Sequence, residues 1–400
     1  MVSNIIKIFK DEFREIFKDP GSLLIMVGAI FLYSLFYTMP FSHNAVRNVP
    51  IGVIDNDNSV LSKNFARDLD STEYVKVTKH YVNMENAKED YYKNKIRAFV
   101  LIPKDFERDV KRGNPSYISS YCDSSFLIIY KQVATAIITL ANETGAKIEI
   151  GTLMKKGLNK NSAIAMVNPV EYIQNPLYNP IGSYQNYMYP IILIMILQQT
   201  MLIGVSMLNA TLRERINGFK ERDTNGNWKL TKLNYISLYS NNPSEIILGK
   251  SLAYVLLYFI YALAYFLIFP SFLIYDMTYN IIPMLLILIP FLFSTAFLGI
   301  SLVYFCKKRE ISFFIMIVSS VPLIFLPGFV WPKEAIPMVL NIFSKFIPFE
   351  AASDGLVKIN QMGASFQQVQ SDFWILIILC ILYFIGAYYT IEKLKNEISA

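Results

Sequence analysis

Six long apolar segments dominate this sequence, and each is long enough to cross a lipid bilayer. A membrane-spanning helix needs about 20 consecutive, mostly apolar residues. Charged residues make up only 17% of the 400-residue chain, whereas soluble domains carry roughly 25%. The segments lie at about residues 21–41, 188–208, 246–269, 281–305, 311–330 and 373–391. The sequence therefore predicts an α-helical polytopic membrane protein with six transmembrane helices.

Lysine and arginine residues gather on one side of these predicted spans. They precede the first span, fill the loop between the second and third, and follow the fourth and the last. Six spans put both termini on one side, and the positive-inside rule makes that side cytoplasmic. We therefore attribute the net charge of +6 to membrane orientation and contact with anionic lipid rather than to nucleic-acid binding. We expect a multi-pass protein of the cell (inner) membrane, with residues 42–185 outside the cytoplasm.

The external segment, residues 42–185, is predicted to fold as an α/β domain inserted between the first two spans. Runs of apolar or β-branched residues predict strands at Val49–Ile54, Val75–Tyr81, Ile96–Ile102 and Tyr117–Tyr121. Helical patterns and end signals predict helices at Leu61–Leu69, Glu85–Asn94, Pro103–Arg112 and Ser125–Thr144.

Residues 1–20 are predicted to form a helix before the first span. Its apolar residues recur at helical spacing, at Ile5, Phe9, Phe13, Ile16 and Phe17. Asp19-Pro20-Gly21 then breaks the chain. The pattern is typical of a helix lying in the cytoplasmic interface of the membrane; the alternative is a cytoplasmic extension of the first span.

The sequence offers little support for catalysis or for a metal site. Only three cysteines and two histidines are present, which argues against a zinc site and a disulfide framework. Gly249-Lys250-Ser251 approaches a phosphate-binding loop, but Ser244 stands where that motif needs glycine. We expect Lys250 instead to reach the lipid headgroups from the start of its span. No cofactor is expected on this chain.

Polar residues inside the predicted spans are few. Gln198, Gln199 and Asn209 lie in the second predicted span, and no acidic or basic residue lies in the middle of a predicted span. Proton- or sodium-driven transporters usually place ionisable groups there. The pattern argues against an ion-coupled transporter and is compatible with energy supplied from outside the chain.

Two loops carry patterns with more than one interpretation. The loop at residues 210–244 mixes charge signs and suits either positive-inside orientation alone or the docking of a soluble partner. Proline residues prevent a single continuous helix after the fifth span, at Pro322, Pro327, Pro332, Pro337 and Pro348. The segment 327–350 is therefore predicted to be an external re-entrant hairpin or an interfacial loop.

Four stretches, in order along the chain, resemble the permease subunits of ABC-2 type exporters, in the branch with a large external domain between the first two spans. FKDPGSLL is similar to the entry to the first span, and RERINGFKER, followed by NPSEIILGK, to the coupling segment. VPIGVIDNDNSVLSKNFARDLDSTEYVKV and IRAFVLIPKDFERDVKRG resemble the external domain. PGFVWPKEAIPMVLNIFSKFIPFEAASDGL is similar to the external segment before the last span.

The resemblance implies partners and roles for particular residues. It implies a separate ATP-binding subunit that holds ATP and magnesium, and a second permease subunit, identical or related. The implied contact with the ATP-binding subunit is made by Arg213, Glu214, Arg215, Ile216, Asn217 and Gly218. The implied external gate contains Pro327, Gly328, Pro332, Pro337 and Pro348. Candidates for lining the substrate path are Gln198, Gln199 and Asn209.

The function expected from this resemblance is export of a small hydrophobic or amphipathic, drug-like molecule. Some members of the branch work with a periplasmic adaptor and an outer-membrane channel. The competing hypothesis is a membrane sensor or envelope-assembly scaffold whose external domain binds a ligand or partner. A membrane enzyme ranks third, because the sequence shows no clustered nucleophile, metal ligands or carboxylate pair.

Overall fold

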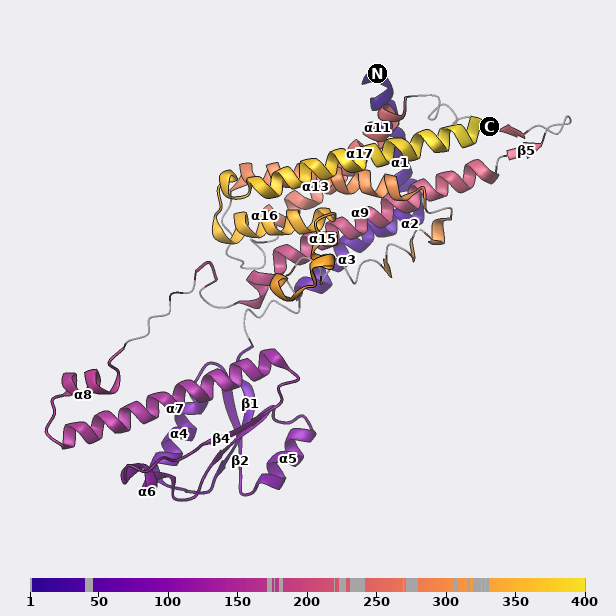
Figure 1. Ribbon diagram of the computed structural model, residues 1–400. Helices are drawn as coiled ribbons and strands as arrows, with labels where there is room; N and C mark the ends of the chain where they lie inside the picture. The colour runs from indigo at the N-terminus through magenta and orange to yellow at the C-terminus, as the bar shows by residue number, and fades with distance from the viewer. Residues whose placement is uncertain are drawn as a thin grey trace. The chain divides into compact units, whose positions relative to one another are not determined.

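The chain divides into two compact units in a computed structural model. The units are Met1–Asn44 with Leu177–Ala400, the helical unit, and Ala45–Pro176, the insert (Figure 1). The structure describes residues 2–39, 46–170, 175, 177–179, 183–218, 220–222, 228–230, 242–268, 270, 280–305, 308–311, 313–314, 317–318, 325, 328 and 331–399. The insert falls within the predicted 42–185 domain.

The helical unit is built from long helices joined by short ones. Before the insert come α1 (Val2–Lys18), α2 (Pro20–Leu23), the π-helix η1 (Leu24–Ala29) and α3 (Ile30–Thr38). After it come α9 (Tyr184–Gly218), the strands β5 (Lys220–Arg222) and β6 (Trp228–Leu230), α11 (Pro243–Leu263), η3 (Ala264–Ile268) and α13 (Ile281–Leu302). The remainder is η4 (Lys333–Ala335), α15 (Met338–Ser344), α16 (Pro348–Met362), η5 (Phe366–Gln368) and α17 (Gln370–Ser399).

Five helical stretches in the described residues are long and apolar enough to cross a membrane. They are Pro20–Tyr37, Gln185–Thr211, Pro243–Ile268, Ile281–Leu302 and Gln370–Asn396. Each coincides with a predicted span. The remaining predicted span, at residues 311–330, lies mostly outside the described residues, so the predicted total of six stays a prediction.

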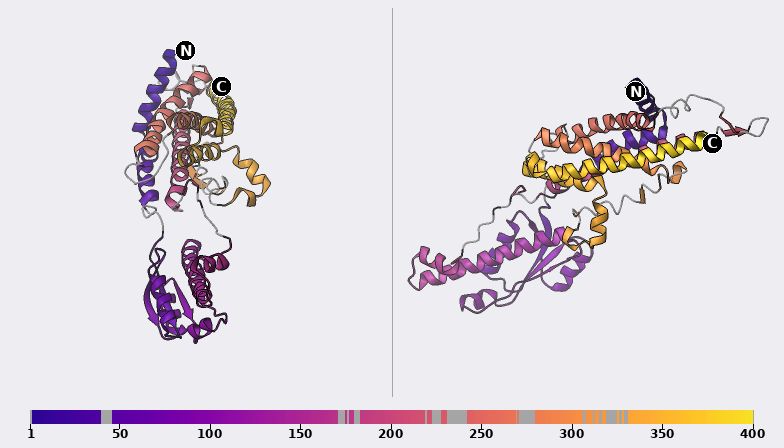
Figure 2. Two further views of the ribbon diagram at one scale, coloured as in Figure 1. Left: turned by 90° about the vertical axis from the view of Figure 1, so that its left-hand side faces the viewer. Right: turned by 45° about the horizontal axis from the view of Figure 1, so that its top comes forward.

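The spans differ in how much of each is enclosed by the rest of the helical unit. In the α9 span 83% of the residues are buried, against 28% in the first and last spans. Helices α13 and α16 pack against both α9 and α17, and Figure 2 shows α17 running along the outside of this group. Helix α9 is therefore the most enclosed of the five described spans, whereas much of α3 and α17 is left for lipid or another chain.

The insert is a four-stranded mixed sheet with helices on both faces. Its strands are β1 (Val49–Asp55), β2 (Val75–Tyr81), β3 (Ala98–Ile102) and β4 (Ser119–Cys122), in the order β2-β1-β3-β4. Strand β1 pairs in parallel with β2 and β3, and β4 is antiparallel to β3. The helices are α4 (Val60–Asp70), α5 (Met84–Tyr92), α6 (Phe106–Lys111), α7 (Leu127–Lys155) and α8 (Lys160–Val167).

Each face of the insert sheet has its own apolar core. One core joins β1, β2 and β3 to helices α4, α6 and α7 through residues such as Val53, Phe65 and Val133. The other joins the opposite face to α5 through residues such as Ile54, Ala87 and Phe99. The predicted strands and first three helices agree with those observed. Helix α7, however, runs beyond the predicted end at Thr144 to Lys155, and α8 was not predicted.

The two sequence phrases that resemble the family's external domain meet in the fold. Asp55, at the end of β1, accepts hydrogen bonds from the Asn58 amide at 2.9 Å and the Ser62 hydroxyl at 2.7 Å. Asp57 accepts a hydrogen bond from the Glu107 amide, in the first turn of α6, at 3.0 Å. These carboxylates therefore satisfy backbone N–H groups in the loop and at a helix end. Their role in this structure is to fix two loops together.

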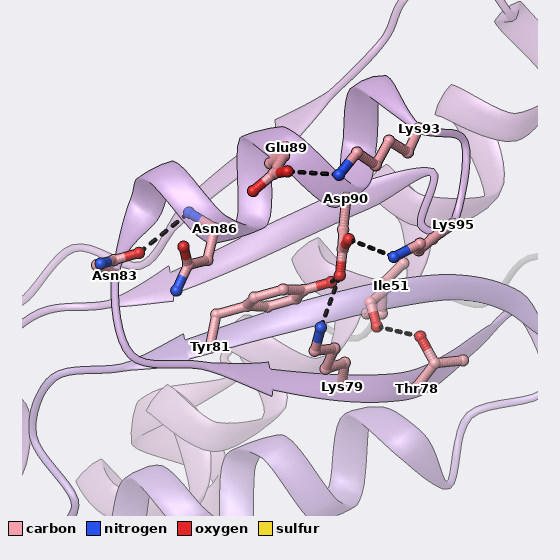
Figure 3. A network of polar contacts seen from close by, with 10 residues as sticks. All are labelled: Ile51, Thr78, Lys79, Tyr81, Asn83, Asn86, Glu89, Asp90, Lys93 and Lys95. Carbon is pink, nitrogen blue, oxygen red and sulfur yellow. Dashed lines mark hydrogen bonds and ion pairs between the residues drawn. The ribbon is translucent and has the colours of Figure 1, made fainter.

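A second polar cluster surrounds Asp90 on α5 (Figure 3). Its carboxylate accepts hydrogen bonds from Lys79 at 2.7 Å, Lys95 at 2.9 Å and the Tyr81 hydroxyl at 3.0 Å. The hydrogen bonds from Lys79 and Lys95 hold the pKa of Asp90 well below its usual range. Burial, with this carboxylate beside it, raises the pKa of Tyr81 to about 12. The cluster fastens α5 to the edge strand β2.

Candidate coupling site

Helix α1 is fastened to the helical unit along one face. Ile8, Glu12 and Ile16 are its buried residues, and their spacing of four places them on one stripe. The helix lies beside α11 (Figure 2). A helix at residues 1–20 was predicted, but its buried stripe contains an acidic residue, which the apolar pattern did not indicate.

A buried ion pair joins α1 to α11. The ammonium nitrogen Nζ of Lys250 lies 3.1 Å from Oε2 of Glu12, and the two side chains are 2% and 8% exposed. Nζ also donates to Oδ1 of Asn209 on α9 at 2.8 Å. The Tyr254 hydroxyl donates to Glu12 and accepts from Nδ2 of Asn209 at 3.3 Å. Four side chains from three helices thus form one closed polar cluster, the Lys250 cluster.

This cluster corrects the expectation that Lys250 reaches the lipid headgroups. The lysine is enclosed, because an acidic residue far away in the sequence provides its counter-charge. The glycine of Gly249-Lys250-Ser251 also has a packing role. A Cβ atom at Gly249 would lie 2.7 Å from Cβ of Ile8 and 3.0 Å from the Ile5 carbonyl oxygen. The absence of a side chain therefore lets α1 approach α11 closely.

A second ion pair lies where α1 gives way to the first span. Arg309 makes a two-pronged contact with Asp19, with Nη1 2.8 Å from Oδ2 and Nη2 2.7 Å from Oδ1. Asp19 also caps α2 by accepting from the Ser22 amide at 2.8 Å. Burial opposes ionisation, but the bonds and charge of Arg309, with Ser22, lower the pKa of Asp19. The predicted break at Asp19-Pro20-Gly21 is thus a capped helix start.

The same arginine connects this junction to the predicted coupling residues. The Arg309 amide donates to Oε1 of Glu214 at 2.9 Å. Arg213, Arg215, Ile216, Asn217 and Gly218 continue the helix α9 to its end, and their side chains lie outside the described residues. The predicted coupling residues are therefore the end of a 35-residue helix rather than a separate short helix. Strands β5 and β6 form an antiparallel pair beyond it.

The three candidates for lining a substrate path do not form one group. Asn209 belongs to the Lys250 cluster. Gln198 and Gln199 lie ten residues or more earlier on α9, about 15 Å along a helix. The side-chain oxygens Oε1 of Gln198 and Gln199 are buried without a hydrogen-bond partner among the described residues. Of the three candidates, Gln198 and Gln199 therefore keep an acceptor that no described residue uses.

The predicted external segment, residues 327–350, leads into a buried helix. Pro327 lies outside the described residues, Gly328 has a φ of +87°, and Pro332 and Pro337 precede η4 and α15. Pro348 begins α16, which is largely buried. A proline at the first position is compatible with a helix because its missing N–H would have no partner there. The buried helix therefore starts where the predicted segment ends.

Ion pairs hold α16 at both ends. Lys333 contacts Glu350 at 3.3 Å. Lys358 bridges Asp354 at 2.9 Å and Asp372 of α17 at 3.0 Å. These contacts were not predicted, because each joins residues that are polar and unremarkable in the sequence. Among the described residues, no group of three or more histidine, cysteine, aspartate or glutamate side chains is placed to hold a metal ion.

Sequence reasoning missed most of the Lys250 cluster. A signal was available: Glu12 lies midway between Ile8 and Ile16 on an apolar stripe, and Lys250 lies seven residues inside a span. Two opposite charges in apolar surroundings would each be costly alone. The pairing itself required the fold, because the two residues are 238 positions apart.

Comparison with known proteins identifies the family. No curated protein matches the chain. A family model described as ABC-2 family transporter protein matches residues 20–389. The match covers the first four candidate membrane-crossing helices, most of the fifth and the whole insert. Permeases of this family are generally non-enzymatic components that work with an ATP-binding subunit. The chain therefore belongs to the ABC-2 transporter family and is a multi-pass, ABC-type membrane permease.

Proposed function

We propose that this chain is the permease subunit of an ATP-driven exporter for a small hydrophobic or amphipathic molecule. A separate ATP-binding subunit holds ATP and magnesium. The observation that carries the proposal is the family match over residues 20–389. In this proposal both termini and the coupling loop at residues 210–244 lie in the cytoplasm, and residues 42–185 lie outside.

The coupling residues are well connected for transmitting force. They end α9, so a push on Arg213–Gly218 acts along one continuous helix through the centre of the unit. Glu214 is bonded to Arg309, which is bonded to Asp19. The Lys250 cluster lies further along α9 and includes α1 and α11. Closure of the ATP-binding subunits would then move α9, α1 and α11 together rather than bending one loop.

A second permease subunit, identical or related, completes the substrate path in this proposal. The unburied faces of α3 and α17 leave room for such a contact. Gln198 and Gln199 are the candidates for meeting the polar part of an amphipathic cargo, because their oxygens have no partner in the described residues. Residues 328–350 and α16 would close the external end. A periplasmic adaptor with an outer-membrane channel would dock on the insert.

The test is co-purification of an ATP-binding subunit from the adjacent gene with the charge-reversed variant Glu214→Lys/Arg215→Glu. We expect the wild-type chain to retain the subunit and to show ATPase activity only in the complex. The variant should lose the subunit and reduce ATP-driven dye export from vesicles at least about tenfold, the scale of 1.4 kcal/mol of lost binding.

The matched control is Glu143→Lys/Lys147→Glu, which reverses an exposed pair in α7. It carries the same kind of change and should leave complex and export intact. Size-exclusion profiles of both variants separate lost docking from misfolding. If a well-folded Glu214→Lys/Arg215→Glu chain still binds the subunit and transports, these residues do not couple. If the wild type binds no ATP-binding subunit, the scaffold hypothesis gains support.

A further inference from the structure

The insert carries a helical arm that extends beyond its core. The buried residues of α7 are Val133, Ala136, Ile137 and Leu140, so the helix leaves the sheet after Leu140. The arm consists of residues 141–170. Its first residue, Ala141, still packs against the core, and within the arm α7 packs against α8 (Figure 1). Ala163 is its one buried residue. The arm therefore adds surface to the insert and almost no core.

The turn at the end of the arm has a defined structure. Gly157 has a φ of +97°, and its amide donates to the Met154 carbonyl at 3.0 Å. The Leu158 amide donates to the Leu153 carbonyl at 3.2 Å, which closes the end of α7. Asn159 caps α8 by accepting from the Ser162 amide at 2.8 Å. These bonds give the tip, Met154–Lys160, a fixed shape.

The charge of the arm's outer part is entirely positive. Residues 150–170 contain Lys155, Lys156 and Lys160 and no aspartate or glutamate. All three lysines are exposed, and the structure gives none of them a carboxylate partner within this fully described stretch. Some lysines elsewhere in the insert are paired, for example Lys79 and Lys95 with Asp90. The tip thus presents positive charge that no described carboxylate neutralises.

Large apolar side chains are exposed beside these lysines. Met154 and Ile164 are exposed on the two helices, Met166 is 63% exposed and Val170 is 83% exposed. Together with the lysines they form an amphipathic, basic surface. Such surfaces bind anionic membranes through lysine contacts with phosphates and partial burial of apolar side chains among the lipids.

We propose that the tip of this arm binds the surface of the membrane through anionic phospholipid headgroups. The chain that leaves α8 at Val167 continues through residues 168–183 into the α9 span, so the arm is covalently held at a bilayer. A second copy of the arm is a poorer occupant, because a symmetric contact would bring two sets of like charges together. Lipid phosphates supply the opposite charge, and the inference holds on either side of the membrane.

The experiment uses the full chain reconstituted in vesicles, with Cys122, Cys306 and Cys380 replaced by serine. A fluorophore is attached at Met154→Cys or, as the reference within the same unit, at Val82→Cys, which is 89% exposed. Spin-labelled lipids quench only a fluorophore that touches the bilayer. Vesicles contain either phosphatidylcholine alone or a phosphatidylcholine and phosphatidylglycerol mixture. The charge variant is Lys155→Gln/Lys156→Gln/Lys160→Gln.

We expect quenching at Met154→Cys, but not at Val82→Cys, in vesicles containing phosphatidylglycerol. Each lysine removed should lower the lipid-contact equilibrium about fivefold, so the triple variant should approach the phosphatidylcholine result. Equal quenching at the two positions would overturn the proposal. Quenching at Met154→Cys that changes neither with the content of phosphatidylglycerol nor with removal of the three lysines would overturn it as well. Pyrene excimers between labels at Met154→Cys, without lipid quenching, would instead identify a second copy as the occupant.

Discussion

The insert and the helical unit each bury a carboxylate, and they neutralise it in different ways. In the insert, Asp90 meets Lys79 and Lys95, whose side chains are 56% and 61% exposed. In the helical unit, Glu12 meets Lys250, and both are enclosed. Water can therefore solvate the charged groups of the first cluster but not those of the second. The enclosed carboxylate of the helical unit therefore depends on a counter-charge supplied by another helix of the same unit.

Glycine residues in helices show the same difference between the units. Gly249 on α11 lies against Ile8 of α1, and Gly204 on α9 lies against Met26 of the first span. In the insert, Gly145 and Gly151 on α7 have no atom within 4 Å of the position of a Cβ. Close helix packing explains the first pair of glycines, whereas nothing in the structure explains the second pair.

The largest expected effect comes from breaking the enclosed pair with Lys250→Met. Among the described residues Glu12 would keep only the Tyr254 hydroxyl as a partner, and an unmatched buried charge costs about 3–5 kcal/mol. We expect a severe loss of monodisperse protein after heating in detergent. The control that sharpens the comparison is Glu12→Gln/Lys250→Met, which removes both charges and should recover more than half of the loss. A single variant as stable as wild type would show that water reaches the cluster.

An intermediate effect is expected from Gly249→Ala. Overpacking of a close contact costs about 1–3 kcal/mol, because the backbone of α1 must move away from the new methyl group. The matched change in the insert is Gly145→Ala, which meets no atom and should stabilise α7 by about 0.5–1 kcal/mol. Opposite signs in thermal unfolding of the two variants would support the packing difference. Equal effects would contradict it.

The smallest effect is expected from Asp90→Asn, and it should depend on pH. The pKa of Asp90 is lowered in the fold from about 3.9 when unfolded, so the unfolded chain takes up a proton first as pH falls. The stabilisation is therefore complete above about pH 4 and is lost below it. We expect wild type and variant to differ in melting temperature at pH 6 and to converge toward pH 2.

This measurement is made on residues 45–176, which have two cores of their own and are expected to fold alone. The neighbouring variant Glu89→Gln removes an exposed pair with Lys93 and should change the melting temperature less than Asp90→Asn does, because exposed pairs contribute little. A pH-independent difference between wild type and Asp90→Asn would mean that the Asp90 carboxylate is not what fastens α5 to β2.

Local patterns were enough to predict most elements of the insert. Strands Val49–Asp55 and Val75–Tyr81 were found within one residue, because alternation and turn residues act over short distances. The extension of α7 from Thr144 to Lys155 was missed. The outer part of α7 buries almost no side chains, so its sequence lacks the apolar stripe from which an amphipathic helix is predicted.

The candidate site was less predictable than the fold. The resemblance predicted a coupling role for Glu214, but its contact with Arg309 joins two segments that lie 95 positions apart in the sequence. Lys250 was expected at the headgroups, because it lies near the start of its predicted span. Nothing in a linear pattern reveals which distant helix will bring a counter-charge.

The sequence by itself determined that this chain crosses a membrane, where five of its spans lie, and that a mixed α/β unit interrupts them. Those properties follow from apolar length and short-range periodicity, which each segment carries alone. Only the tertiary structure decided that Glu12 neutralises Lys250, that Arg309 joins Asp19 to the end of α9, and that α16 is buried. A charge or proline becomes tolerable in an apolar interior only through the atoms that surround it, and packing alone selects those atoms.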